Sequence, residues 1–238
     1  MPDLASLSQR ITEWLRDEVQ RAGCRGLVLG LSGGLDSSVT ALLCSRALPE
    51  NTLGLIMPCE SISRDKEHAM LLIREFSLQY REVDLSTTYR SLLNVLDDEG
   101  EGLKAANIKP RLRMTTLYYF AHQQDYLVVG TGNRSELAVG YFTKHGDGGV
   151  DLLPLGRLLK SEVRELAQYL GVPETIINKE PSAGLWEGQR DEEEMGLTYR
   201  QLDGYLEGEE VGEEVKHQVL GMMNSSRHKK RPPLIFEP

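Results

Sequence analysis

A glycine- and serine-rich stretch reads Gly30-Leu31-Ser32-Gly33-Gly34-Leu35-Asp36-Ser37-Ser38. An apolar run, 26–31, precedes it and a helical pattern, 39–44, follows it, so the expected order is buried strand, tight turn, helix. Glycines let the backbone approach a ligand closely, and the free N–H groups of a helix start point at any anion bound there. We therefore expect a phosphate-binding loop.

The side chains of this loop indicate which kind of phosphate chemistry it can support. Ser32, Ser37 and Ser38 supply hydroxyl groups, and Asp36 can hold a divalent cation beside phosphates. The Gly-x-x-x-x-Gly-Lys-Ser/Thr pattern of a Walker A loop is absent from the stretch, and so is a lysine that could reach a γ-phosphate. Such a loop is better suited to holding a pyrophosphate than to transferring a terminal phosphoryl group.

The pattern Ser-Gly-Gly-x-Asp-Ser resembles the signature of the N-type ATP pyrophosphatases, also called the PP-loop family. Members of that family activate a substrate by adenylation and release pyrophosphate. The resemblance implies a Rossmann-like adenine nucleotide alpha hydrolase fold of the α/β class.

Alternation of strand and helix patterns supports that fold class. The expected strands are 26–31, 53–57, 80–84 and 126–131. The expected helices are 3–21, 39–48, 63–76, 86–96, 107–122, 160–170, 199–206 and 209–224, with loops at 140–153 and 179–191. Alternation of this kind implies parallel βαβ units with right-handed crossovers, that is, a parallel sheet with helices on both faces. Ligands then bind beyond the carboxyl ends of the strands.

Composition limits the classes of protein that fit. The chain has 238 residues and 40% hydrophobic residues, which is enough for one domain with a substantial core. The net charge of −9, from 36 acidic against 27 basic residues, argues against a general nucleic-acid binder. With no long apolar run and no signal peptide pattern, we expect a cytoplasmic protein with no membrane partner. The three cysteines are far apart, which is typical of reduced thiols.

A second informative region follows the last expected strand. Gly130-Thr131-Gly132-Asn133-Arg134-Ser135-Glu136 places Glu136 beyond a strand end, where it can face Asp36. Two carboxylates beside a phosphate site indicate Mg²⁺, which prefers carboxylates together with phosphate oxygens. Taken alone, Glu136 is equally compatible with an ordinary charge in the first turn of a helix.

Six motifs together resemble the ammonia-dependent NAD synthetases. The stretch after Glu136, 140–151, contains Gly-Tyr-Phe-Thr-Lys-x-Gly-Asp-Gly-Gly-x-Asp. The stretches 107–114, 179–186 and 188–192 and the basic tail 228–233 fit the same family. The resemblance covers residues 26–234, and it implies a single NAD synthetase domain over residues 1–238.

The resemblance implies roles for individual residues of this sequence. The residues implied to bind ATP are Gly30, Leu31, Ser32, Gly33, Gly34, Leu35, Asp36, Ser37, Thr131, Lys160 and Ser182. Asp36 and Glu136 are implied to hold Mg²⁺, and Asp36 and Lys160 to act in catalysis. The residues implied to hold deamido-NAD are Arg111, Lys144, Asp151, His228 and Lys229. Arg113 and Arg231 are further candidates for that substrate.

The implied reaction is amidation of deamido-NAD to NAD through an adenylate, with ATP as co-substrate and with release of pyrophosphate and AMP. In a chain of this length we expect no glutaminase domain, so free ammonia would be the nitrogen donor. The family also implies a homodimer with the dinucleotide site at its interface, and lids over the site at 58–64 and 182–195.

Two alternatives stay open from the sequence. One is another adenylating PP-loop enzyme, such as a tRNA thiolase or a lysidine synthetase, although the paired cysteines usual in thiolases are absent. The other is a nucleotide-binding protein without catalysis, in which the combination of Asp36, Glu136 and Lys160 would not be expected.

Overall fold

Four parallel strands form one sheet in the computed structural model, which describes residues 3–60, 63–186 and 188–237. In spatial order they are β3 (Tyr80–Glu82), β2 (Thr52–Ile56), β1 (Gly26–Gly30) and β4 (Tyr126–Val129). The central strand β1 pairs in register with both neighbours, so that Leu29 lies opposite Gly54 on one side and Val129 on the other. The carboxyl ends of β1, β2 and β4 therefore meet at one edge of the sheet.

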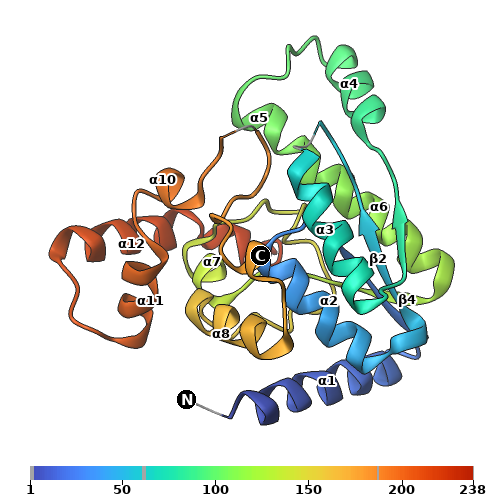
Figure 1. The fold of residues 1–238 in the computed structure, drawn as a ribbon. Helices are drawn as coiled ribbons and strands as arrows, with labels where there is room; N and C mark the ends of the chain where they lie inside the picture. The colour runs from blue at the N-terminus through green and yellow to red at the C-terminus, as the bar shows by residue number, and fades with distance from the viewer. Residues whose placement is uncertain (1–2, 61–62, 187, 238) are drawn as a thin grey trace.

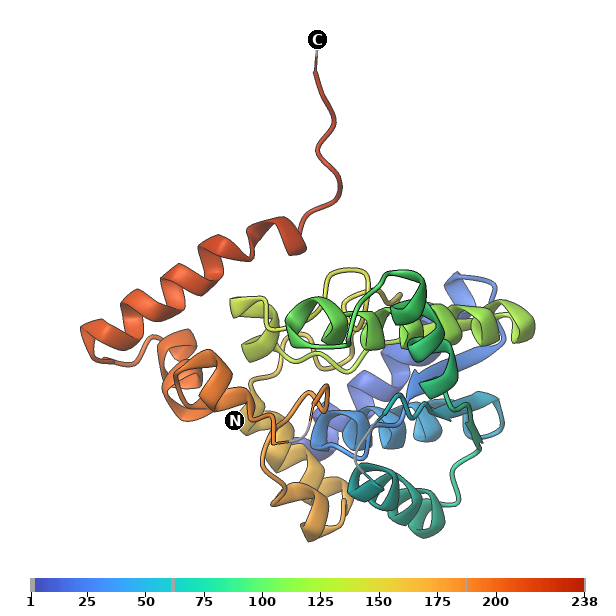
Figure 2. The ribbon, with the colours of Figure 1, turned by 90° about the horizontal axis from the view of Figure 1, so that it is seen from above.

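Helices cover both faces of the sheet, as predicted. Leu27 and Leu29 of β1 pack on one face and Val28 on the other, because successive side chains of a strand alternate. One face carries α1 (Leu4–Arg21), α2 (Leu35–Ala47), α3 (Ser63–Phe76), α8 (Lys160–Leu170) and α9 (Glu174–Ile177). The other carries α4 (Ser86–Val95), α5 (Gly102–Ala106) and α6 (Ile108–Gln124). Figures 1 and 2 show α6 on the opposite side of the sheet from α3 and α8.

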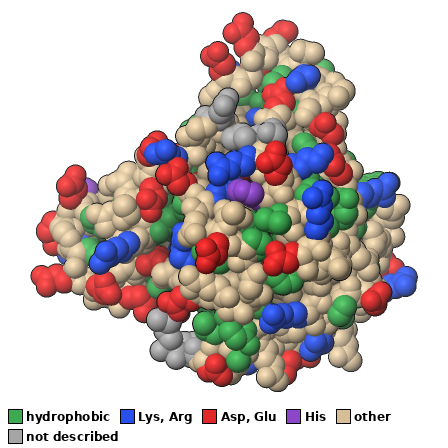
Figure 3. Space-filling view, viewed as in Figure 1, with side chains coloured by type: hydrophobic (Ala, Val, Ile, Leu, Met, Phe, Trp, Pro, Cys, Tyr) green, Lys and Arg blue, Asp and Glu red, His purple; other side chains and the backbone are tan. Residues whose placement is uncertain are grey.

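A third, smaller hydrophobic cluster lies at the end of the chain. It joins α7 (Arg134–Val139) to α10 (Asp191–Met195), α11 (Tyr199–Glu207) and α12 (Glu213–Ser225). Acidic side chains gather over the end formed by α11 and α12 (Figure 3). Beyond α12 and a short 3-10 turn (Arg227–Lys229), the tail extends away from the body of the protein (Figure 2).

The structure corrects several expected boundaries. Helix α2 begins at Leu35, four residues earlier than predicted, because Gly34 accepts hydrogen bonds from the Ser38 backbone N–H and from the Ser37 and Ser38 hydroxyl groups. Strand β3 is two residues shorter than predicted. The short helices α5, α7 and α9 were not predicted. In the described residues, no helix is long and apolar enough to cross a membrane.

Candidate functional site

The glycine-rich loop connects β1 to α2 at the carboxyl edge of the sheet. Gly33 adopts a φ of +71°, and a Cβ atom there would lie 2.1 Å from the backbone oxygen of Asp65. Only glycine fits a position that is both left-handed and this crowded. The hydroxyl groups of Ser32 and Ser37 lie 2.9 Å apart across the loop. The loop therefore closes on itself and leaves the start of α2 directed at the space beyond the strands.

That space is a cavity of about 530 Å³. Its walls come from the loop, the ends of β2 and β4, α6, α8 and the segment 179–194. All of the residues implied to bind ATP line it except Gly33, which packs against α3 instead. The cavity thus brings Thr131, Lys160 and Ser182 together with the loop from positions far apart in the chain.

A buried ammonium group lies at the base of the cavity. Lys160, only 6% exposed, places its Nζ atom 2.6 Å from a carboxylate oxygen of Asp36 and 3.2 Å from one of Glu136. Burial alone would lower the pKa of Lys160, but the two carboxylates outweigh burial and raise it. Lys160 therefore stays charged at neutral pH.

Two helix starts hold this cluster in place. Asn133 is fully buried; its side chain caps α7 by accepting from the Glu136 N–H and also donates to Asp36 at 2.9 Å. The Ser135 hydroxyl accepts from the Lys160 backbone N–H at 3.0 Å and donates to Asp203. The turn after β4 thus orients both Asp36 and Lys160.

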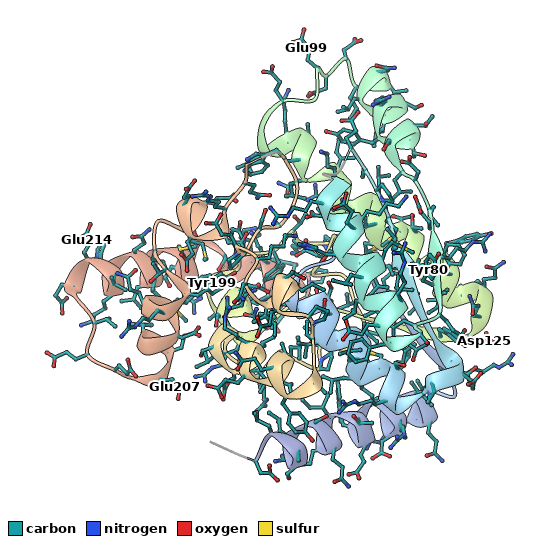
Figure 4. All side chains as sticks on the ribbon, in the orientation of Figure 1. Tyr80, Glu99, Asp125, Tyr199, Glu207 and Glu214 are labelled. Carbon is teal, nitrogen blue, oxygen red and sulfur yellow. The ribbon has the colours of Figure 1, made fainter. Side chains whose placement is uncertain are left out.

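A polar network links the cluster to the segment that covers the cavity. The Tyr199 hydroxyl lies 3.3 Å from Glu136 and 3.1 Å from Asp191, and the Tyr141 hydroxyl donates to Asp191 at 3.0 Å. Burial, together with the nearby carboxylates, raises the pKa of both tyrosines, so each stays protonated. Figure 4 shows Tyr199 in the interior, whereas Glu207 points toward solvent.

The cluster has the donor set and the charge for a magnesium ion. Burial raises the pKa of Glu136 to about 7, with Lys160 opposing the shift and Asp36 adding to it. When both carboxylates are ionised, one negative charge remains after the Lys160 ammonium is counted. In the described part of the chain, no three His, Cys, Asp or Glu side chains are grouped as a metal site on their own. The residues fit Mg²⁺ when phosphate oxygens complete its ligands, because Mg²⁺ prefers one or two carboxylates together with phosphate.

Glu136→Gln is expected to remove a pH dependence of stability. Because the pKa of Glu136 is raised from 4.5 to about 7, the folded chain binds a proton more tightly than the unfolded chain does. Its contribution is complete below pH 4.5 and is lost as the pH rises to 7, by up to about 3 kcal/mol. Urea unfolding at pH 5 and pH 7 measures this. An equal decline in wild type and variant would contradict the assignment.

The residues implied to hold deamido-NAD lie mostly outside the cavity. Lys229 lines it and donates to the backbone oxygens of Gly140 and Phe142. Arg111 donates to the Lys144 backbone oxygen, and Lys144 donates to the His228 backbone oxygen at 2.8 Å. Arg111, Lys144, His228 and Lys229 therefore lie next to one another, from the cavity wall outward, and we call these four residues the basic surface.

Asp151 has different partners. Its carboxylate accepts from the Tyr118 hydroxyl at 2.9 Å and from the Val128 backbone N–H at 2.8 Å. It therefore ties the exposed side of α6 to β4. Burial and the bond to Asp151 raise the pKa of Tyr118 to about 12, so the hydroxyl donates at neutral pH.

Four residues of the site were not among the implied site residues. They are Asn133, Tyr141, Asp191 and Tyr199. Asn133, Tyr141 and Asp191 fall inside quoted motifs, and the Asn-x-x-Glu spacing of a capping box was a readable signal for Asn133. No pattern in the sequence indicated that Tyr199 lies beside Glu136, since 63 residues separate them.

Comparison with known proteins adds four likenesses: one family model, one relative by sequence and two solved structures. The sequence model of a family described as NAD synthase matches residues 7–233. A protein named NH(3)-dependent NAD(+) synthetase from Carboxydothermus hydrogenoformans is 53% identical over 232 residues, with 96% of each chain covered. The structure of NMN synthetase from Francisella tularensis has a TM-score of 0.95 at 38% identity, covering 99% of each chain. An NH3-dependent NAD synthetase structure from Campylobacter jejuni has a TM-score of 0.83 at 29% identity, covering 99% of this chain and 100% of the other.

Proposed function

Because the chain belongs to the NAD synthase family, we propose that it uses ATP and ammonia to convert the carboxylate of deamido-NAD into the amide of NAD. The observation that carries this proposal is the cavity in which the phosphate-binding loop meets the cluster of Asp36, Lys160 and Glu136. That arrangement supplies anion binding, a fixed positive charge and two carboxylates for a cation, which are the requirements of adenylation.

The proposed reaction has two steps, adenylation of the acid and attack by ammonia. A carboxylate oxygen of the acid forms a bond to the α-phosphorus of ATP, and the bond to the β-phosphate oxygen breaks, so pyrophosphate leaves with the electron pair. The nitrogen of ammonia then forms a bond to the activated carbonyl carbon. The carbon–oxygen bond to the phosphate breaks, AMP leaves, and the nitrogen loses a proton.

The residues of the chain act by positioning and by charge, without a protein nucleophile. The start of α2 and the loop serines bind the outer phosphates, with Thr131 and Ser182 at the nucleotide. The Lys160 ammonium stabilises the negative charge that develops on the α-phosphoryl oxygens. Asp36 and Glu136 would hold Mg²⁺, which supplies further charge neutralisation at the phosphates.

We assign the basic surface outside the cavity to the acid substrate. Arg111, Lys144, His228 and Lys229 suit an anionic dinucleotide, and Asp151 holds the adjoining end of α6. This surface lies open in a single chain, which supports a homodimer whose second copy closes it. Light scattering of the purified chain tests the dimer. The described residues of 182–195 would serve as a lid. Residue 187 of that lid and residues 61–62 of the other implied lid, 58–64, lie outside the described residues.

We propose that the chain is a single domain and that the enzyme is cytoplasmic. Val139 of α7 shares the third hydrophobic cluster with residues of α10 to α12, so the end of the chain packs onto the same unit that carries the site. The substrates proposed for it are metabolites of the cytoplasm.

A second acid substrate is favoured by one observation. The structural likeness to the NMN synthetase is closer than that to the NAD synthetase from C. jejuni, with TM-scores of 0.95 and 0.83. The reacting group of deamido-NMN is the same carboxylate on the same ring. The second candidate is therefore amidation of deamido-NMN to NMN by the same two steps.

One assay separates these possibilities. The chain is mixed with ATP, Mg²⁺, ammonium and either deamido-NAD or deamido-NMN, and AMP, pyrophosphate and the amide are measured. Equal amounts of AMP and NAD support the first candidate, and a higher kcat/KM with deamido-NMN supports the second. AMP without either amide would indicate a different adenylating enzyme. Unmodified tRNA would then be the next acceptor to test. ATP binding without AMP from any acceptor would leave a nucleotide-binding protein.

A further inference from the structure

An ion pair at the rim of the cavity is not used in the proposed mechanism. The Nζ atom of Lys179 lies 2.6 Å from a carboxylate oxygen of Asp65, and the two side chains are 19% and 21% exposed. Both residues line the cavity. Asp65 stands in the first turn of α3, and Lys179 follows α9, whose Ile176 and Ile177 are buried in the main core.

This ion pair lies directly beside the phosphate-binding loop. Gly33 packs against the backbone oxygen of Asp65, and the next nearest atoms around it belong to His68 and Ala69 of the same helix. The loop residues on either side, Ser32 and Gly34, line the cavity together with Lys179. The ammonium group of Lys179, bound to the side chain of Asp65, therefore faces the same cavity as the loop that would hold the outer phosphates.

Other cations of the cavity wall have structural partners. Arg164 donates to the Ile177 backbone oxygen at 2.7 Å and so holds the end of α9. Lys229 donates to two backbone oxygens, and Lys160 lies between its two carboxylates. Among the described residues, Lys179 instead pairs with the carboxylate of Asp65, and that residue lines the cavity too.

The neighbouring histidine adds no second positive charge. His68 is 9% exposed, and its Nδ1 atom has no hydrogen-bond partner among the described residues. Burial, together with the charges of Lys179 and Arg64, lowers the pKa of His68. The imidazole is therefore neutral at pH 7. Lys66 of the same helix also lines the cavity, but its ammonium group pairs with Glu82 at 2.7 Å.

Pyrophosphate carries several negative charges as it leaves, and the loop itself contains no lysine. We propose that Lys179 binds the β- and γ-phosphoryl oxygens of ATP, exchanging the Asp65 carboxylate for phosphate, and that it keeps this contact to the pyrophosphate product. This inference rests on the proposed adenylation reaction. It gives Asp65 a definite role as the competing anion that the phosphate group must displace.

The position of Lys179 also connects this exchange to the lid. The residue begins the segment 179–186, in which the Pro181 backbone oxygen accepts from the Asp191 N–H. A lysine that moves from Asp65 to phosphate shifts the beginning of this segment. Release of pyrophosphate and return of Lys179 to Asp65 are thereby linked.

The test compares Lys179→Met with Asp65→Asn. If the ion pair is structural, both variants weaken pyrophosphate binding, whereas a phosphate-binding Lys179 predicts that only Lys179→Met does so. Binding of magnesium pyrophosphate is measured by calorimetry, and the KM values for ATP and for the acid are measured in the assay above. Lys179→Met is expected to weaken pyrophosphate binding and to raise the KM for ATP by about tenfold to a hundredfold, the usual loss for a charged hydrogen bond. The KM for the acid should not change.

Asp65→Asn frees the lysine and is expected to tighten pyrophosphate binding severalfold. Lys179→Arg should restore most of the affinity, and Lys216→Met, which breaks a surface ion pair with Glu213 on α12, serves as the matched control. Equal weakening by Lys179→Met and Asp65→Asn would overturn the proposal and leave a structural ion pair. If Lys179→Met fails to fold, weaker binding by Asp65→Asn is enough to reject it.

The calorimetric measurement needs no turnover. Wild-type chain that binds pyrophosphate through Lys179 but forms no AMP would contradict the proposed reaction and leave this inference standing. If the wild-type chain forms AMP but Lys179→Met binds pyrophosphate as tightly as the wild type, the proposed reaction stands and the role of Lys179 is rejected.

Discussion

Lys160→Met is expected to reduce AMP formation by at least about a hundredfold. Removal of one preorganised group that stabilises developing charge costs about two to three orders of magnitude in kcat. The same change leaves the buried carboxylates of Asp36 and Glu136 without their ammonium partner. Loss of one partner from a buried ion pair destabilises a protein by about 3 kcal/mol. Quenched-flow measurement of AMP and urea unfolding of the same preparation give the two effects.

The double variant Glu136→Gln/Lys160→Met separates the two effects. It removes one of the two unpaired charges and should recover part of the lost stability while AMP formation stays low. If AMP formation recovers together with stability, Lys160 acts only as a structural residue and its catalytic assignment is wrong.

Asp36→Asn is expected to lower AMP formation by about two to three orders of magnitude while the fold is kept. An asparagine at this position can still accept the hydrogen bond from Asn133, but it brings no charge for a cation and presents N–H groups toward Lys160. We also expect a higher Mg²⁺ concentration for half-maximal rate. A magnesium titration of the steady-state rate measures both quantities.

Glu207→Gln is the matched control for Asp36→Asn. Glu207 pairs with Arg134 on the surface and is 54% exposed at its side chain, so its neutralisation removes the same charge away from the cavity. Rates in this variant should equal those of the wild type. An Asp36→Asn enzyme with an unchanged magnesium titration would contradict the metal assignment and leave Asp36 as a partner of Lys160 only.

The arrangement of the sheet was predictable because its signals are local. Apolar runs such as 26–31 and 126–131 mark buried strands, and long helices such as α6 and α8 show their periodicity over three or more turns. The short helices α5, α7 and α9 have only four to six residues each. A helical period cannot be recognised over so few positions, so these helices were missed.

The site was predictable only as far as its motifs reach. The resemblance named Asp36, Glu136 and Lys160, but it did not indicate that the lysine lies between the two carboxylates. Asp36 and Lys160 are 124 residues apart, and their contact depends on the packing of α8 against α2. Tyr199 reaches Glu136 only because α11 packs on α7 and α8, which no local pattern in the sequence describes.

Helix α2 begins in the phosphate-binding loop, and ten of its 13 residues are buried. It packs against both α1 and α8, so it has no face that can separate from the protein without exposing the main core. Local opening requires segments with few buried contacts, and α2 is the opposite of such a segment. The amide hydrogens of 38–47 should exchange with solvent only through global unfolding, whereas those of 182–186 and 188–190 should exchange through local opening. Nucleotides would therefore enter and leave by transient excursions of the covering segment, while the anion-binding end of α2 persists in every folded molecule.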